Sequence, residues 1–273
     1  MGLAGALTDL QALTERLRRD CPWDREQTAR TIVPHTVEEA YEVADAALAG
    51  DDEKLHDELG DLLFQTYFLA LLLDERGKGS LEDVARLVHE KLVRRHPHVF
   101  GEVQADTAER VRSNWERIKV EQEGRQGIFH DVPDGLPALL RARKVQKRAA
   151  HVGFEYPDVL GAFGDLREEI GELGEELERT HGAGAAAGAT PRPRETEPDR
   201  RVFDELGDLL LATVNVARML DVDPELALRA STDRFRSRVE RAEALAAADG
   251  EDFSSLTLTA QDRYFDQAKT EED

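Results

Sequence analysis

Two parts of the chain carry the same acidic pattern in the same order. The first part reads Glu38-Glu39-Ala40-Tyr41-Glu42 and then Asp57-Glu58-Leu59-Gly60-Asp61-Leu62-Leu63. The second part reads Glu168-Glu169-Ile170-Gly171-Glu172 and then Asp204-Glu205-Leu206-Gly207-Asp208-Leu209-Leu210. A cation pair and then an aromatic residue follow each part, so four elements recur in order. Such a repeat indicates one structural unit used twice, and we expect two domains, residues 1–125 and 126–273.

The hydrophobic pattern within the repeat is that of a helix. Placing residues about 100° apart gathers one apolar stripe from Leu55, Leu59, Leu62, Leu69 and Leu73. The abundance of Ala, Leu, Glu and Arg favours helices over strands. We therefore predict an all-α fold of tandem helical-bundle units. Residues 181–199 are rich in Gly, Ala and Pro, which predicts a flexible insertion in the second unit.

The acidic residues are spaced so that they can meet. Residues three apart share a helix face, so Glu39 lies with Glu42 and Glu58 lies with Asp61. If the two helices are antiparallel across the turn at residues 50–51, four carboxylates converge, as in metal sites of helical bundles. Oxygen ligands alone suit a hard cation, of which Mg²⁺ fits best and Mn²⁺ can substitute. A di-iron centre would instead favour Glu-x-x-His pairs, which these motifs lack.

The position of these acids argues against an ordinary solvated surface. Glu58 and Asp61 lie beside the leucine stripe instead of opposite it, where a charge would be freely solvated. Gly60 and Gly207 each lie inside a helix at a cost of about 1 kcal/mol relative to alanine. Their matching positions suggest close approach by another backbone or by a ligand. One ExxE motif alone is common on charged helices, whereas the repeated pair is specific.

Composition narrows the classes of function and location. The net charge is -21, with 57 acidic against 36 basic residues, so we expect no stable binding to nucleic acid. A single cysteine, Cys21, allows no disulfide within the chain and fits a reducing compartment. We find no signal peptide and no apolar segment of the roughly 20 residues that span a bilayer. We therefore expect a soluble, cytoplasmic protein without membrane binding.

Five segments together resemble the MazG family of nucleoside triphosphate pyrophosphohydrolases. They are Cys21-Pro22-Trp23-Asp24, Glu38-Glu39-Ala40-Tyr41-Glu42, Glu58-Leu59-Gly60-Asp61-Leu62-Leu63, Arg95-His96-Pro97-His98-Val99-Phe100 and Trp115-Glu116-Arg117-Ile118-Lys119. The resemblance runs through nearly the whole chain. It implies an all-α fold, usually assembled as a homodimer whose helices complete each other's bundles. It also implies hydrolysis of an NTP or dNTP to the monophosphate and pyrophosphate.

The resemblance also assigns roles to residues of both units. Metal ligands would be Glu39, Glu42, Glu58 and Asp61 in the first unit and Glu169, Glu172, Glu205 and Asp208 in the second. The triphosphate would be held by Lys91 and Arg95 or by Arg234 and Arg238, with Lys119 or Lys269 added. Trp115 would stack on the base, and Phe265 occupies the matching position. Glu39 or Glu169 would orient the water that attacks the α-phosphorus.

The sequence leaves the working unit and the substrate open. Trp115 and the compact spacing favour catalysis in the first unit, whereas family precedent favours the second. Broad-specificity clearance of aberrant nucleotides is expected from the resemblance alone. The alternative is a regulatory or interaction scaffold that has kept the helical fold and lost catalysis. The preferred base and sugar and the number of metal ions stay undetermined.

Overall fold

The computed structural model describes residues 2–101, 103, 106–107, 110–111, 114–115, 118, 127–130, 132–181 and 199–272. Within these ranges the regular elements are helices and there is no strand, which confirms the all-α prediction. The chain divides into two compact units, Met1–Arg125 and Gln126–Asp273. None of the described helices combines the length and apolar character that a membrane crossing needs.

The first unit is built around an antiparallel helix pair. Its helices are α1 (Leu3–Asp20), α2 (Pro22–Glu26), α3 (Ala29–Ala49), α4 (Asp52–Asp74), α5 (Leu81–Arg95) and α6 (Pro97–Phe100). The chain reverses between α3 and α4 at Gly50, whose φ of +68° is a left-handed conformation that favours glycine. Asp51 then caps α4, because its side chain accepts a hydrogen bond from the Lys54 backbone N–H at 2.9 Å. This tight turn holds the two acidic helices side by side.

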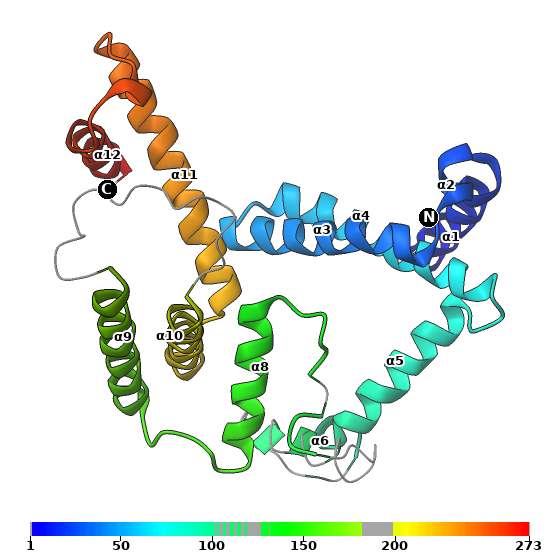
Figure 1. The fold of residues 1–273 in the computed structure, drawn as a ribbon. Coiled ribbons are helices and arrows are strands. Elements are labelled where there is room, and N and C mark those ends of the chain that lie inside the picture. Colours follow the sequence, from blue (N-terminus) through cyan, green and yellow to red (C-terminus); the bar gives the residue numbers. More distant parts are fainter. Residues whose placement is uncertain are drawn as a thin grey trace. The chain divides into compact units, whose positions relative to one another are not determined.

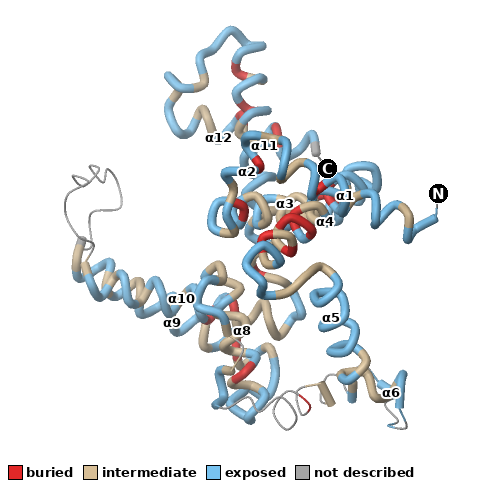
Figure 2. The backbone as a smooth tube through the Cα atoms, turned by 90° about the vertical axis from the view of Figure 1, so that its right-hand side faces the viewer, coloured by how far each residue is buried: buried red, intermediate tan, exposed pale blue. Residues whose placement is uncertain are grey.

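The core of this unit lies between α3 and α4, but one side of α4 is open. Phe68 and Leu72 of α4 are buried against Ile32 of α3, and Figure 2 shows buried positions concentrated along this pair. The predicted leucine stripe is only partly correct, because Leu59 is 49% exposed while its neighbour Glu58 is 8% exposed. The reason is that α3 covers the Phe68 side of α4, and no described element of the unit covers Leu59.

The second unit has a similar helix pair followed by a helical hairpin. Its elements are α8 (Ala138–His151), α9 (Val159–His181), α10 (Arg200–Met219), α11 (Pro224–Ala248), the 3-10 turn η1 (Phe253–Ser255) and α12 (Leu258–Glu272). Helix α10 packs on α9 and on α8, and α12 folds back on the distal part of α11 (Figure 1). Buried Ala242, Ala246 and Tyr264 form the contact between α11 and α12.

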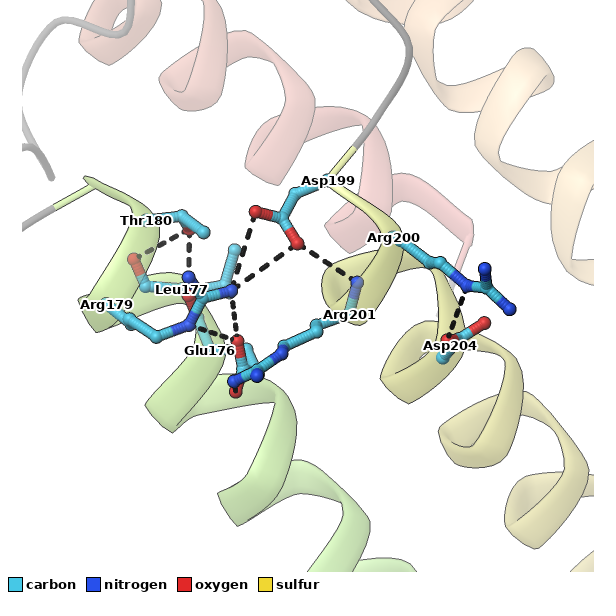
Figure 3. Close-up of polar contacts among 8 residues, drawn as sticks. All are labelled: Glu176, Leu177, Arg179, Thr180, Asp199, Arg200, Arg201 and Asp204. Carbon is cyan, nitrogen blue, oxygen red and sulfur yellow. Dashed lines mark hydrogen bonds and ion pairs between the residues drawn. The ribbon is translucent and has the colours of Figure 1, made fainter.

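The ends of α9 and α10 are joined by charged side chains where the predicted insertion begins and ends (Figure 3). Arg179 donates to Glu176 at 2.6 Å and to Asp199 at 3.4 Å. Asp199 also caps α10 by accepting from the Arg201 backbone N–H at 3.0 Å. Residues 182–198, on which the prediction of a flexible insertion falls, lie outside the described residues. The contacts of Arg179 with Glu176 and Asp199 join the end of α9 to the start of α10, on either side of that segment.

Candidate metal centres

A group of carboxylates from α3 and α4 meets in the first unit. One carboxylate oxygen each from Glu39, Glu58 and Asp61 lie within 4.8 Å of one another. Glu42 belongs to the same group, since its charge raises the pKa of both Glu39 and Glu58. The antiparallel pairing therefore brings the ExxE and ExxD motifs of this unit together. We call these four residues the first acidic cluster.

The second unit repeats this arrangement with α9 and α10. Carboxylate oxygens of Glu169, Glu205 and Asp208 lie within 4.8 Å of one another. Glu172 is close enough that its charge raises the pKa of both Glu169 and Glu205. These four residues form the second acidic cluster, which lies on an equivalent pair of helices and has the same motif order as the first.

Both clusters concentrate negative charge in a partly desolvated place. Burial raises the pKa of Glu39, and the charges of Asp61 and Glu42 raise it further. Burial likewise raises the pKa of Glu169, with added repulsion from Glu172 and Asp208. A raised carboxyl pKa means that the ionised form is disfavoured in the folded chain. Each cluster would therefore gain stability from a cation that neutralises it.

The ligand atoms fit a hard divalent cation. Each cluster offers carboxylate oxygen alone, which is the ligand type that Mg²⁺ and Mn²⁺ prefer. The Oε2 atom of Glu169 is buried and has no hydrogen-bond partner within the described residues. Buried polar oxygens are ordinarily paired, so this atom is available to a ligand. Both observations are consistent with a metal held at the second acidic cluster.

On both α4 and α10 a glutamate of the cluster is less exposed than the leucine that follows it, which is the reverse of an ordinary surface helix. In α4 the carboxylate of Glu58 is buried while Leu59 is 49% exposed, and in α10 Glu205 is partly buried while Leu206 is 46% exposed. A helix that packed only for stability would have the opposite order. The acids thus face inward toward their cluster, and the leucines form an apolar surface on the outside.

The expected close approach at the two helical glycines is not found within the chain. Apart from the helix's own backbone, no heavy atom of the described chain lies within 4 Å of the point where a Cβ would stand at Gly60 or Gly207. The described residues therefore supply no backbone that approaches these glycines, and the predicted approach of a ligand or of another backbone stays a prediction. The space beside each glycine is open and can take a group from outside the chain.

A cavity of about 630 Å³ adjoins the second acidic cluster. Glu169 and Asp208 form part of its wall together with Asp165. The apolar and aromatic part of the wall consists of Phe129, Val145, Ala149, Gly153, Phe154, Tyr156, Leu211 and Ala212, and the polar side chains of Gln146, Glu155, Asn215 and Arg218 complete it. Carboxylates on one side and aromatic rings on another suit a ligand with a charged part and a flat apolar part.

Polar groups of the cavity wall are held in fixed positions. Arg218 donates to Glu155 at 2.7 Å and to Oδ1 of Asn215 at 2.7 Å. A hydrogen bond to Asp165 raises the pKa of Tyr156, so the phenol stays protonated. The wall is thus preorganised by contacts among α9, α10 and the segment that joins α8 to α9.

The basic and aromatic residues predicted to bind substrate lie on other elements. Phe265 packs against Phe235 with ring centroids 5.7 Å apart, in the hairpin of α11 and α12. Trp115 meets His96 edge-on at 5.1 Å. Lys269 pairs with Asp266 at 3.6 Å. The other predicted positions are Lys91 and Arg95 on α5, Arg234 and Arg238 in the middle of α11, and Lys119, which lies outside the described residues.

Sequence reasoning missed the cavity residues of the second unit. Phe154 and Tyr156 lie in the short segment after α8, and Asn215 and Arg218 lie on α10 beyond the acidic motif. One signal was available in the sequence, because Asp208, Leu211, Ala212 and Asn215 are spaced as one helix face. The contribution of α8 and of the segment after it had no such signal.

The chain is similar to known nucleotide pyrophosphohydrolases. Residues 27–100 match the family model of the MazG nucleotide pyrophosphohydrolase domain. The nucleoside triphosphate pyrophosphohydrolase of Escherichia coli (strain K12) is 38% identical over 270 residues, which cover 96% of this chain and 97% of that protein. The nucleoside triphosphate pyrophosphohydrolase/pyrophosphatase MazG of Thermotoga maritima is 37% identical over 96% of this chain and 94% of its own length.

A third relative matches about half of this chain. The nucleoside triphosphate pyrophosphohydrolase of Mycobacterium tuberculosis is 34% identical over 149 residues, which cover 54% of this chain and 46% of that protein. The matches to the Escherichia coli and Thermotoga maritima proteins span nearly the full length of this chain and of each relative. The similarity is therefore not confined to the segment that matches the family model.

Proposed function

Because this chain belongs to the MazG family of nucleotide pyrophosphohydrolases, we propose that it hydrolyses nucleoside triphosphates to nucleoside monophosphate and pyrophosphate. The observation that carries the proposal is the second acidic cluster beside an aromatic-walled cavity of about 630 Å³. The cluster suits a metal-bound triphosphate, and the cavity suits a base and sugar. Broad specificity, as in clearance of aberrant nucleotides, is part of this proposal.

Mg²⁺ is the proposed cofactor, with Mn²⁺ as a substitute. It would be held in the first unit by Glu39, Glu42, Glu58 and Asp61 and in the second by Glu169, Glu172, Glu205 and Asp208. When bound, the ion would neutralise phosphate charge and lower the pKa of the attacking water. The unpartnered Oε2 of Glu169 supports a role for this residue in orienting that water in line with the α-phosphorus.

The second unit is the proposed site of catalysis. Glu169 and Asp208 belong both to the second acidic cluster and to the cavity wall, so one ligand could reach both. Arg234 and Arg238 of α11 remain candidates for holding the leaving pyrophosphate, since two cations four residues apart share a helix face. Lys269 and Phe265 of α12 remain candidates for binding the substrate, on the basis of the family resemblance.

A homodimer is proposed as the working assembly. Phe203, Leu206 and Leu210 are 65%, 46% and 50% exposed and are spaced as one stripe of α10. Asp208 and Asn215 project from the other side of this helix. An apolar stripe of this kind is unfavourable in water and typical of a surface covered by another helix. A second copy of the chain would cover it without blocking the cavity.

The experiment that tests the proposed function is a nucleotide panel. Each of the eight common NTPs and dNTPs is incubated with the protein and Mg²⁺, and pyrophosphate is measured. We expect release of pyrophosphate and the nucleoside monophosphate in equal amounts from several of them, and none after chelation of the metal. Absence of release above the chelated control for every nucleotide would favour the catalytically lapsed scaffold.

A further inference from the structure

The side-chain amide of Asn215 is held through its oxygen, while its nitrogen is left to donate to a ligand. Its Oδ1 accepts hydrogen bonds from Nε of Arg218 at 3.1 Å and from Nη2 of Arg218 at 2.7 Å. A guanidinium only donates, so the atom that faces it must be the amide oxygen. The Nδ2 atom of Asn215 then points the other way and donates to no group within the described residues.

Arg218 is itself fixed, so the orientation of Asn215 does not depend on solvent. The guanidinium of Arg218 forms an ion pair with Glu155 at 2.7 Å, and its side chain is 13% exposed. Charge-assisted hydrogen bonds in a partly buried place are strong and directional. Glu155 and Arg218 therefore form a support that presents the two N–H donors of Asn215 in one direction.

The position of Asn215 in the cavity indicates what these donors meet. Asn215 lines the same cavity as Phe129, Phe154 and Tyr156, which offer stacking surfaces. It lies seven residues after Asp208 on α10, which is about 10 Å along the helix axis. A group bound at Asn215 is thus well removed from phosphates held at the carboxylates, in a cavity whose wall also carries three aromatic rings.

We infer that Asn215 is a specificity-determining residue that donates a hydrogen bond to an acceptor on the nucleobase, and that Arg218 and Glu155 are its positioning residues. The acceptor is a ring nitrogen or a carbonyl oxygen, so several bases can satisfy it. The inference rests on the proposed function, because it takes the occupant of the cavity to be a nucleoside triphosphate.

The test compares the nucleotide that the wild-type protein hydrolyses fastest with analogues that lack one acceptor of its base at a time. A ring nitrogen is replaced by C–H, or a carbonyl is removed. We expect one analogue to show a KM about tenfold higher with kcat changed less than about threefold, because a donor of the site is left unpaired. The others should behave like the parent nucleotide.

Asn215→Asp is the matched variant, since it keeps the shape and the acceptor for Arg218 but removes both N–H donors. We expect its KM values for the parent and all analogues to agree within about twofold. Arg218→Lys should lose the same discrimination while its melting temperature stays close to wild type. A purely structural role for Arg218 would instead lower stability and kcat and leave the ratio of KM values unchanged.

Three results would overturn the inference. The wild type could hydrolyse all the analogues with the KM of the parent, or Asn215→Asp could keep the wild-type discrimination. Alternatively, Asn215→Asp could change only the preference between ribose and deoxyribose, which would assign the donor to the sugar. Failure of the proposed function is separate, because the wild type would then release no pyrophosphate from any nucleotide.

Discussion

Glu169→Gln is expected to lower kcat/KM for pyrophosphate release about 10²- to 10³-fold, whereas Glu39→Gln should stay within about threefold of wild type. The reason is that Glu169 belongs to the second acidic cluster and to the wall of the adjoining cavity. Its Oε2 is buried without a partner in the described part of the chain. Glutamine keeps the size of the side chain and removes the charge, so the change isolates electrostatics from packing.

The neighbouring residue supplies a matched control. Glu168 is exposed, precedes Glu169 in the same helix and is not among the acids that meet in the cluster. Glu168→Gln removes the same charge and should retain wild-type activity. The assay measures pyrophosphate from the best nucleotide at several concentrations for all three variants. Loss of activity in Glu39→Gln with retention in Glu169→Gln would place catalysis in the first unit.

Introducing charge on the outer stripe of α10 is expected to convert a dimer into a monomer. The double variant Leu206→Glu with Leu210→Glu places two carboxylates on a surface where the wild type has side chains 46% and 50% exposed. Burying unpaired charge in an apolar interface is strongly unfavourable. We also expect kcat/KM to fall at least about tenfold, because α10 carries the cavity on its other side and loses the support of the partner.

Mass is measured by light scattering on a sizing column at micromolar protein. The control is Lys147→Glu, at an exposed position on α8. Like the double variant, it makes the net charge of the protein more negative by two. That variant should keep the wild-type mass and activity. A wild-type protein that is monomeric and fully active at this concentration would contradict the proposed dimer, as would a double variant that stays dimeric.

The two acidic clusters could be predicted from the sequence, because they depend on residue spacing within helices. Residues three apart share a helix face, and a two-residue turn at Gly50 and Asp51 leaves the helices antiparallel. Those two facts are enough to bring Glu39 to Glu58 and Asp61. The all-α class followed equally directly from composition and periodicity. The second acidic cluster followed from the repeat, despite the long segment between its helices.

The parts that depend on tertiary packing could not be predicted in the same way. Periodicity finds an apolar stripe but does not say which element covers it, so Leu59 was expected in the core and is exposed. Gly60 and Gly207 were expected at a close contact with another backbone or with a ligand. The described residues supply no such backbone, so the contact with a ligand stays a prediction. The cavity joins α8, α9 and α10 with the segment around Phe154, and no local pattern relates these segments to one another.

The predicted cationic and stacking residues remain predictions. Arg234, Arg238 and Lys269 lie on α11 and α12, and Phe265 packs on Phe235. Their roles rest on resemblance, and the variants that test them are Arg234→Gln and Arg238→Gln. Cytoplasmic location likewise stays a prediction.

The proposed hydrolysis depends on divalent ions held by the acidic clusters. The most direct measurement is anomalous X-ray scattering from crystals of the protein soaked in Mn²⁺, with Glu169→Gln crystals treated in the same way. We expect an anomalous peak enclosed by Glu169, Glu205 and Asp208 in the wild type, and a weakened or absent peak in the variant. A wild-type protein that hydrolyses nucleotides while its crystals show no manganese between these carboxylates would rule out these residues as the metal ligands.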